Sequence, residues 1–117
     1  MLRRVSLIAF VGVLLTAPML AQVPGGAPLS EREERGRKIF DRRCYICHQR
    51  DSDRVKSLGP PPLDGLFSRE RLVTGKPVSA ANVKEIIKTG PTPGMPGFQY
   101  TLSDPEIDDL IEYLKTK

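Results

Sequence analysis

The chain has 117 residues, enough for one domain. Its formal net charge is +4, but two of the arginines lie within the first four positions, and without them the excess falls to +2. So small a positive excess excludes the electrostatic pattern of a nucleic-acid-binding protein. Seven aromatic residues and no tryptophan are few for a core. A domain of this size often needs a disulfide, a metal or a bulky cofactor to fold.

Residues 1–21 have the layout of a secretory signal peptide, with two arginines, an apolar run and a final alanine. The apolar run is shorter than the ~18 residues that a membrane span needs. We expect cleavage after Ala21 and export to the bacterial periplasm. The alternative is an uncleaved anchor that holds the protein at the outer face of the inner membrane. Residues 22–29 are then a Pro/Gly linker, and residues 30–117 form the domain.

The domain is predicted to begin with a helix over residues 31–43. Ser30 and Glu33 have the spacing of a capping box, and the acidic start and basic end of the segment complement the helix dipole. Gly36 and Phe40 lie four residues apart and therefore share one helix face. A mid-helix glycine costs about 1 kcal/mol relative to alanine. It indicates either a closely packed backbone or a tolerated glycine on a solvated face.

Two further helices and long loops are predicted for the rest of the domain. Residues 49–78 include three successive prolines, which exclude a helix interior or a central strand. Ser79 is the expected cap of a helix over residues 80–89, and residues 90–98 form a second Pro/Gly loop. Ser103 then begins a last amphipathic helix. No stretch alternates like a half-buried strand, so the predicted fold class is all-α.

The stretch CYICH contains both cysteines and the only histidine of the chain, Cys44, Cys47 and His48. A thioredoxin-type CxxC would follow a strand in a βαβ pattern, and the sequence has none. A structural zinc site needs four ligands, and a Cys44–Cys47 disulfide would close only a very small loop. C-x-x-C-H is the motif of covalent haem attachment, with two thioether bonds and a proximal histidine ligand. In an exported chain it predicts one haem c, bound through Cys44 and Cys47.

Met95 is the candidate for the second ligand to the haem iron. His48 has no second histidine to pair with, and cleavage of the signal removes Met1 and Met19. Met95 lies within PGMPG, where prolines and glycines restrict the backbone and no helix stripe requires an apolar side chain. Its alternative role is that of a flexible core filler. Ligation by His48 and Met95 would raise the reduction potential and suit one-electron transfer.

The sequence resembles the class I cytochrome c family over residues 30–117. The segments GRKIFDRRCYICH, LDGLF, GMPGF and LSDPEIDDLIEYL carry the resemblance. It implies the all-α cytochrome c fold, with about three main helices and long loops wrapped around one covalently attached haem. It also implies that the first helix crosses the last. Gly36 and Phe40 match the first-helix residues at this crossing, and their expected partners are Leu110 and Tyr113.

The resemblance also implies neighbours for the haem. In the family, the carbonyl of a proline that follows a glycine accepts the proximal imidazole N–H. This proline is Pro61 or Pro60, depending on the end from which the residues are counted. Arg69 matches an arginine near a haem propionate, and a solvated surface arginine is its alternative. Tyr100 and Phe98 are expected to line the haem crevice, or else to be ordinary packing residues.

Together these features predict a periplasmic one-electron carrier, not an enzyme, whose partners are an unidentified donor protein and acceptor protein. One alternative is a haem subunit dedicated to a single dehydrogenase or oxidase complex. Another is a haem enzyme, or a gas or peroxide sensor, with a displaceable sixth ligand. Residues 31–76 carry twelve basic and eight acidic side chains, whereas residues 104–112 carry five acids and no base. This asymmetry either orients the chain on a redox partner or reflects solvated helix faces.

Overall fold

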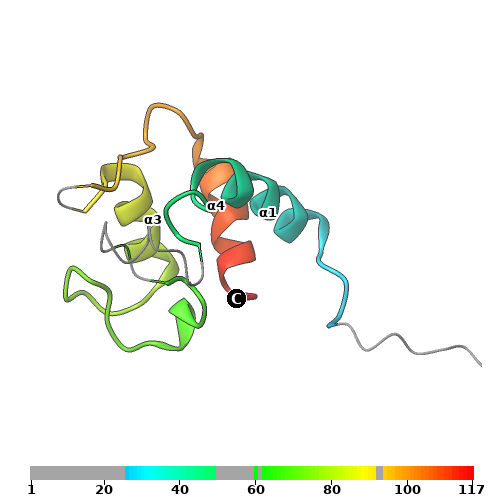
Figure 1. The fold of residues 1–117 in the computed structure, drawn as a ribbon, viewed down its shortest axis with the longest axis horizontal. Helices are drawn as coiled ribbons and strands as arrows, with labels where there is room; N and C mark the ends of the chain where they lie inside the picture. Colours follow the sequence, from blue (N-terminus) through cyan, green and yellow to red (C-terminus); the bar gives the residue numbers. More distant parts are fainter. Residues whose placement is uncertain (1–25, 50–59, 61, 92–93) are drawn as a thin grey trace, which may run out of the picture.

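The computed structural model describes residues 26–49, 60, 62–91 and 94–117. Its helices are α1 (Glu31–Arg43), a short 3-10 helix η1 (Leu66–Ser68), α3 (Ala80–Thr89) and α4 (Asp104–Leu114). In Figure 1, α4 lies between α1 and α3, and it contacts both of them. Within these residues the only β-type pairing is an isolated bridge between Arg71 and Pro77. The all-α prediction with three main helices is therefore confirmed.

The N-terminal segments of the chain lie largely outside the described residues. The signal peptide predicted for residues 1–21 lies outside the described residues, as does the first half of the linker at 22–29. Both assignments, and the domain boundary at residue 30, stay predictions. In the described part of the chain, no helix combines the length and the apolar character that crossing a membrane requires.

The helix boundaries follow local capping interactions. At α1, the Glu33 carboxylate accepts from the Ser30 N–H at 2.6 Å, and the Ser30 hydroxyl accepts from the Glu33 N–H at 3.3 Å. The Ser79 hydroxyl caps α3 by accepting a backbone N–H at 3.1 Å. At α4, the Glu106 carboxylate accepts from the Ser103 N–H at 2.8 Å. These interactions satisfy donors that the first helical turn leaves unpaired, which is why the sequence predicts the starting points.

The crossing of α1 over α4 is set by Gly36. A Cβ atom at this position would overlap the Asp109 carbonyl oxygen and lie 2.9 Å from the Tyr113 Cβ atom. One turn later, the ring of Phe40 packs on that of Tyr113, with centroids 5.5 Å apart. The predicted close packing at Gly36 is confirmed, with Tyr113 as one partner. Leu110, the other expected partner, is buried with Phe40 in the core, but none of its atoms is among the three nearest to a Cβ at Gly36.

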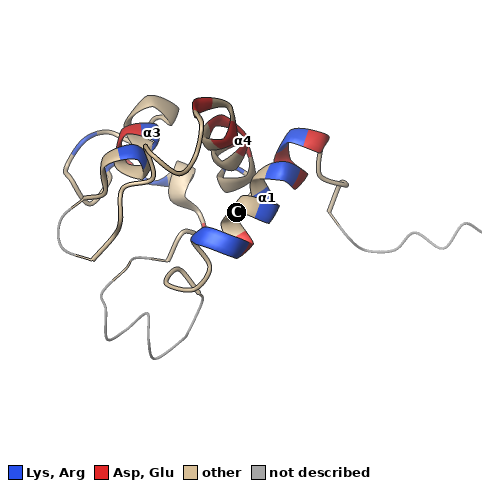
Figure 2. Ribbon diagram, turned by 90° about the horizontal axis from the view of Figure 1, so that it is seen from above, with Lys and Arg blue, Asp and Glu red and all other residues tan. Residues whose placement is uncertain are grey.

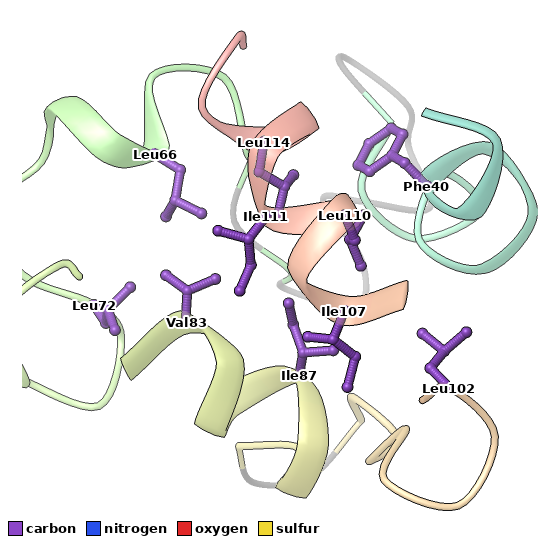
Figure 3. Close-up of a cluster of buried hydrophobic side chains, with 10 residues drawn as sticks. All are labelled: Phe40, Leu66, Leu72, Val83, Ile87, Leu102, Ile107, Leu110, Ile111 and Leu114. Carbon is purple, nitrogen blue, oxygen red and sulfur yellow. The ribbon is translucent and has the colours of Figure 1, made fainter. Parts of the chain in front are cut away.

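Among the described residues, ten buried apolar side chains form the core, and Figure 3 shows them gathered around α4. They are Phe40, Leu66, Leu72, Val83, Ile87, Leu102, Ile107, Leu110, Ile111 and Leu114. Ile107 and Leu110 are the most deeply buried residues of α4, at 0% and 1% exposure. Cys44 is half-buried and packs against this cluster. The CYICH segment therefore lies at the edge of the apolar core.

The acidic residues of α4 bind groups within the fold. In the ribbon of Figure 2, acidic residues are coloured along α4 and basic residues on the neighbouring helices. The contacts between helices join Asp109 to Arg32 and Arg35 of α1, and Asp104 and Asp108 to Lys84 and Lys88 of α3. Glu106 binds the α4 cap, and Glu112 binds Lys115. The five acids of residues 104–112 thus have partners inside this chain, which argues against a free acidic pole there.

Candidate haem-attachment site

CYICH continues from α1 as a hydrogen-bonded turn. Cys44 is the C-cap of α1, and its N–H donates to the Phe40 carbonyl at 2.9 Å. The N–H groups of Cys47 and His48 both donate to the Cys44 carbonyl, at 3.1 and 2.9 Å. Residues at i, i+3 and i+4 of a helical turn share one side. The local fold thus places the two cysteines and the histidine on one side of the turn.

The properties of the thiols argue against a redox switch. Neither Cys44 nor Cys47 is in a disulfide. Burial raises the pKa of the Cys44 thiol to about 11, and the charge of Cys47 adds to this shift. The reactive thiols of disulfide oxidoreductases have a lowered pKa instead. Cys44 is therefore a protonated, half-buried thiol at neutral pH.

The site also lacks the ligand grouping of a structural zinc centre. Among residues 26–49, 60, 62–91 and 94–117, no group of three or more His, Cys, Asp or Glu side chains could hold a metal ion. Cys44, Cys47 and His48 belong to this part of the chain, and they do not converge as metal ligands. A zinc centre built on CYICH has no support in this geometry.

Met95 lies in a segment that docks on the C-terminal end of α3. Beyond it, the Phe98 N–H donates to the Ile87 carbonyl at 2.9 Å, and the Gln99 N–H donates to the Lys88 carbonyl at 3.2 Å. Phe98 packs against the core, and Met95 is half-buried. The residues that follow the single methionine of the described part of the chain are thus held by backbone hydrogen bonds to a helix end.

Arg69 holds the loop that precedes η1. Its Nη2 atom donates to the carbonyls of Pro62 at 2.5 Å and Asp64 at 2.8 Å. These contacts brace the chain between the prolines and the 3-10 helix. The role of Arg69 at a haem propionate stays a prediction, because the contacts seen are with the chain's own backbone.

Two other predicted neighbours of the haem receive less support. The side chain of Tyr100 is 90% exposed, and nothing in its position favours a place in a haem crevice. Pro61 lies outside the described residues, while Pro60 is half-buried. The assignment of the imidazole acceptor to Pro61 or Pro60 therefore stays open.

Sequence reasoning missed an aromatic and cationic cluster next to Cys44. The rings of Tyr45 and Phe40 pack edge to face, with centroids 6.3 Å apart. Lys117 places its Nζ atom 4.8 Å from the Phe40 ring centroid and 3.6 Å from the Asp64 carboxylate. Lys117 thereby covers Phe40 and links the end of α4 to the loop before η1. Lys117 is too far from Phe40 and Asp64 in the sequence for a local pattern to reveal its contacts with them.

The residues present fit a covalently attached haem. Two unbridged thiols and an imidazole lie on one side of a turn at the edge of an apolar core, and a thioether is held in a docked loop. This fold and motif define a c-type cytochrome, a haem protein that carries electrons. A family model described as "Cytochrome C oxidase, cbb3-type, subunit III" matches residues 31–114, and the chain belongs to this family.

One curated relative is the "Alcohol dehydrogenase (quinone), cytochrome c subunit" of Gluconobacter oxydans (strain 621H). It is 31% identical to this chain over 87 residues, which cover 68% of the chain. The chain spans only 17% of the length of that relative. No solved structure matches the chain. The resemblance to the cytochrome c family is thus confirmed, with its all-α fold.

Proposed function

We propose that this protein is an exported, periplasmic one-electron carrier. Cys44 and Cys47 hold one haem covalently, and His48 and Met95 bind its iron. The observation that supports this proposal best is the turn that carries both thiols and the imidazole, beside a core that Cys44 already contacts. The bound haem supplies the redox-active iron, and the chain supplies ligands, orientation and burial.

The docking of Met95 favours a carrier over an enzyme or a sensor. A sensor needs a sixth ligand that leaves when a small molecule binds. The segment around Met95 is instead tied to two carbonyls of α3, through Phe98 and Gln99. His/Met ligation also stabilises reduced iron and raises its potential, which suits reversible one-electron transfer.

The partners that we propose are other redox proteins. The relative's printed name places it as the cytochrome c subunit of a dehydrogenase, which keeps a dedicated haem subunit as the alternative to a free carrier. Tyr45 and Ile46, between the two cysteines, are 51% and 55% exposed. Lys38 and Arg42 form no ion pair with another described residue. Exposed apolar side chains in the motif, and cations of the preceding helix without an ion-pair partner among the described residues, suit transient docking on an acidic protein surface.

Carbon monoxide binding and the reduction potential test the ligand assignment. The reduced wild-type protein should stay low-spin and bind carbon monoxide slowly. Met95→Ala should lower the potential and open the iron to carbon monoxide, because the thioether is lost. Ile46→Ala, an exposed position within the attachment motif, is the control and should behave as wild type. Rapid carbon monoxide binding by the wild type, or an unchanged Met95→Ala spectrum, would refute the assignment.

Purification under native conditions distinguishes a free electron carrier from a haem subunit dedicated to one enzyme complex. A free carrier should elute from size-exclusion chromatography of a native periplasmic extract at the size of one small domain. A dedicated subunit should co-elute with haem-linked dehydrogenase or oxidase activity. Co-elution that survives high salt would overturn the free-carrier form of the proposal while leaving the haem ligation intact.

A further inference from the structure

Gly90 and Gly97 bracket Met95, and both are packed too closely for a side chain. At Gly90, a Cβ atom would overlap the Met95 carbonyl oxygen and lie 2.9 Å from the Gly97 nitrogen. At Gly97, it would lie 2.6 Å from the Lys88 carbonyl oxygen and 2.8 Å from that of Thr89. Since backbone atoms cannot rotate away as a side chain can, either Cβ would force the loop and α3 apart.

Hydrogen bonds explain why the loop that contains Met95 lies so close to the last turn of α3. The Ile86, Ile87 and Lys88 carbonyls, in the last turn of α3, accept from the N–H groups of Gly90, Phe98 and Gln99 at 2.8, 2.9 and 3.2 Å. The chain therefore leaves the helix at Gly90 and returns onto the same turn at Phe98. Met95 lies between these two points of attachment.

Gly90 differs from the other positive-φ glycines in how closely it is packed. Its φ is +70°, and Gly75 has φ +79°. A Cβ atom at Gly75 would meet nothing within 4 Å, and the same holds for Gly65 and Gly94. Of the positive-φ glycines in the described part of the chain, Gly90 alone combines the positive φ with a crowded site. Gly75 has the positive φ without the crowding, so it serves as the control for placing alanine at a positive φ.

We propose that Gly90 and Gly97 are positioning residues for Met95. By lacking side chains, they let the backbone of residues 94–98 lie directly on α3, which fixes the place of the thioether and makes it a permanent ligand. A displacement of about 1 Å is enough to impair a metal or cofactor site. The inference rests on the proposed function, in which Met95 binds the haem iron.

The first test compares Gly90→Ala with Gly75→Ala in the haem-loaded protein. The readouts are the thioether-to-iron charge-transfer band of the oxidised form, the reduction potential, and carbon monoxide binding by the reduced form. We expect Gly90→Ala to lose most of the band, to have a lower potential and to bind carbon monoxide about tenfold faster than wild type, equivalent to about 1.4 kcal/mol. Gly75→Ala also places alanine at a positive φ, but at an open site, and should match wild type in all three. A wild-type band in Gly90→Ala, or equal losses in both variants, overturns the proposal.

The second test uses Gly97→Ala, with Gly26→Ala as its control. Gly97 does not have a positive φ, so alanine there tests the close approach alone, and Gly26 has no atom within 4 Å of an added Cβ. If Gly90→Ala takes up no haem, the comparison of Gly97→Ala with Gly26→Ala tests the proposal in its place. A weakened band in Gly97→Ala relative to Gly26→Ala supports the proposal, and equal bands overturn it.

Met95→Ala in the same assays distinguishes this inference from the proposed function. If Met95→Ala keeps the band, the ligand assignment fails, and the positioning role fails with it. If Met95→Ala loses the band while both glycine variants keep it, only the positioning role is wrong.

Discussion

Gly36 of α1 is in backbone contact with Asp109 of α4, because a Cβ atom at Gly36 would overlap the Asp109 carbonyl oxygen. The side chain of the same aspartate accepts from Arg32 Nε at 2.9 Å and from Arg35 Nε at 2.7 Å. Both arginines lie within one turn of Gly36. A single residue of α4 is therefore held to α1 both by backbone packing and by two charge-assisted hydrogen bonds.

Gly36→Ala should destabilise the protein. Alanine adds about 1 kcal/mol of helix propensity. Against this, the new methyl group meets backbone atoms that no side-chain rotation can move, and overpacking of this kind costs about 1–3 kcal/mol. We expect a net loss of up to about 2 kcal/mol in the free energy of unfolding. Urea denaturation followed by circular dichroism measures it, with Gly26→Ala as the control. A midpoint equal to that of the control contradicts the packing argument.

Asp109→Asn should change the pH dependence of stability. A hydrogen bond from Arg35, and a weaker contribution from the hydrogen bond of Arg32, hold the pKa of the Asp109 carboxyl below its ordinary value. A lowered folded-state pKa contributes stability that is complete above the ordinary aspartate pKa of about 3.9 and is lost as the pH falls through the folded value. We expect Asp109→Asn to cost up to about 1 kcal/mol at neutral pH, the range of solvent-screened pairs. This difference should shrink in acid.

Urea unfolding at neutral and acidic pH checks this prediction. Glu85→Gln breaks the more exposed pair between Lys76 and Glu85, whose carboxylate lies 2.7 Å from the lysine nitrogen. This control should lose less stability at neutral pH than Asp109→Asn. A stability difference for Asp109→Asn that is the same at every pH would show that the carboxylate charge is not responsible.

Replacing both cysteines should leave a mostly unfolded chain. The ten buried apolar residues in the described part of the chain form a small core, and Cys44 lies against its edge, where the haem would add apolar surface. Cys44→Ala combined with Cys47→Ala removes the covalent attachment, so the chain loses the group that completes its core. Far-ultraviolet circular dichroism and limited proteolysis measure the result. Tyr45→Ala with Ile46→Ala, at exposed positions of the same motif, should still fold with haem. A haem-free double cysteine variant with wild-type helix content would refute this prediction.

Neutralising Lys38 and Arg42 should slow electron exchange with anionic partners. Both residues lie in the second half of α1, which leads into Cys44, and neither forms an ion pair with another described residue. We expect Lys38→Gln with Arg42→Gln to slow reduction of ferricyanide at low salt and to weaken its salt dependence. Arg71→Gln with Lys76→Gln removes the same charge from the loop before α3 and should have a smaller effect. Equal slowing in both double variants would show that net charge, and not this surface, governs the rate.

The sequence alone was enough for the features that depend on neighbours a few residues away. Capping interactions join Ser30 to Glu33 and Ser103 to Glu106, both at i and i+3, so the spacing predicts the helix starts. CYICH is equally local, because one turn of chain aligns Cys44, Cys47 and His48. Periodicity also predicted the three helices and the all-α class. Each of these follows from interactions within about one helical turn.

Only the tertiary structure decided which distant groups meet. Arg32 binds an aspartate 77 positions away, and the five acids of residues 104–112, which the composition alone presents as a charged face, bind partners within the fold. Gly90 and Gly97 resemble ordinary loop glycines until the loop folds back, which brings residues 95–97 against Gly90 and the last turn of α3 against Gly97. The charge of a side chain and the conformational freedom of a glycine are properties of single residues. The groups that these residues contact depend on where helices cross and where loops fold back onto the core. That placement is determined by packing around the whole core.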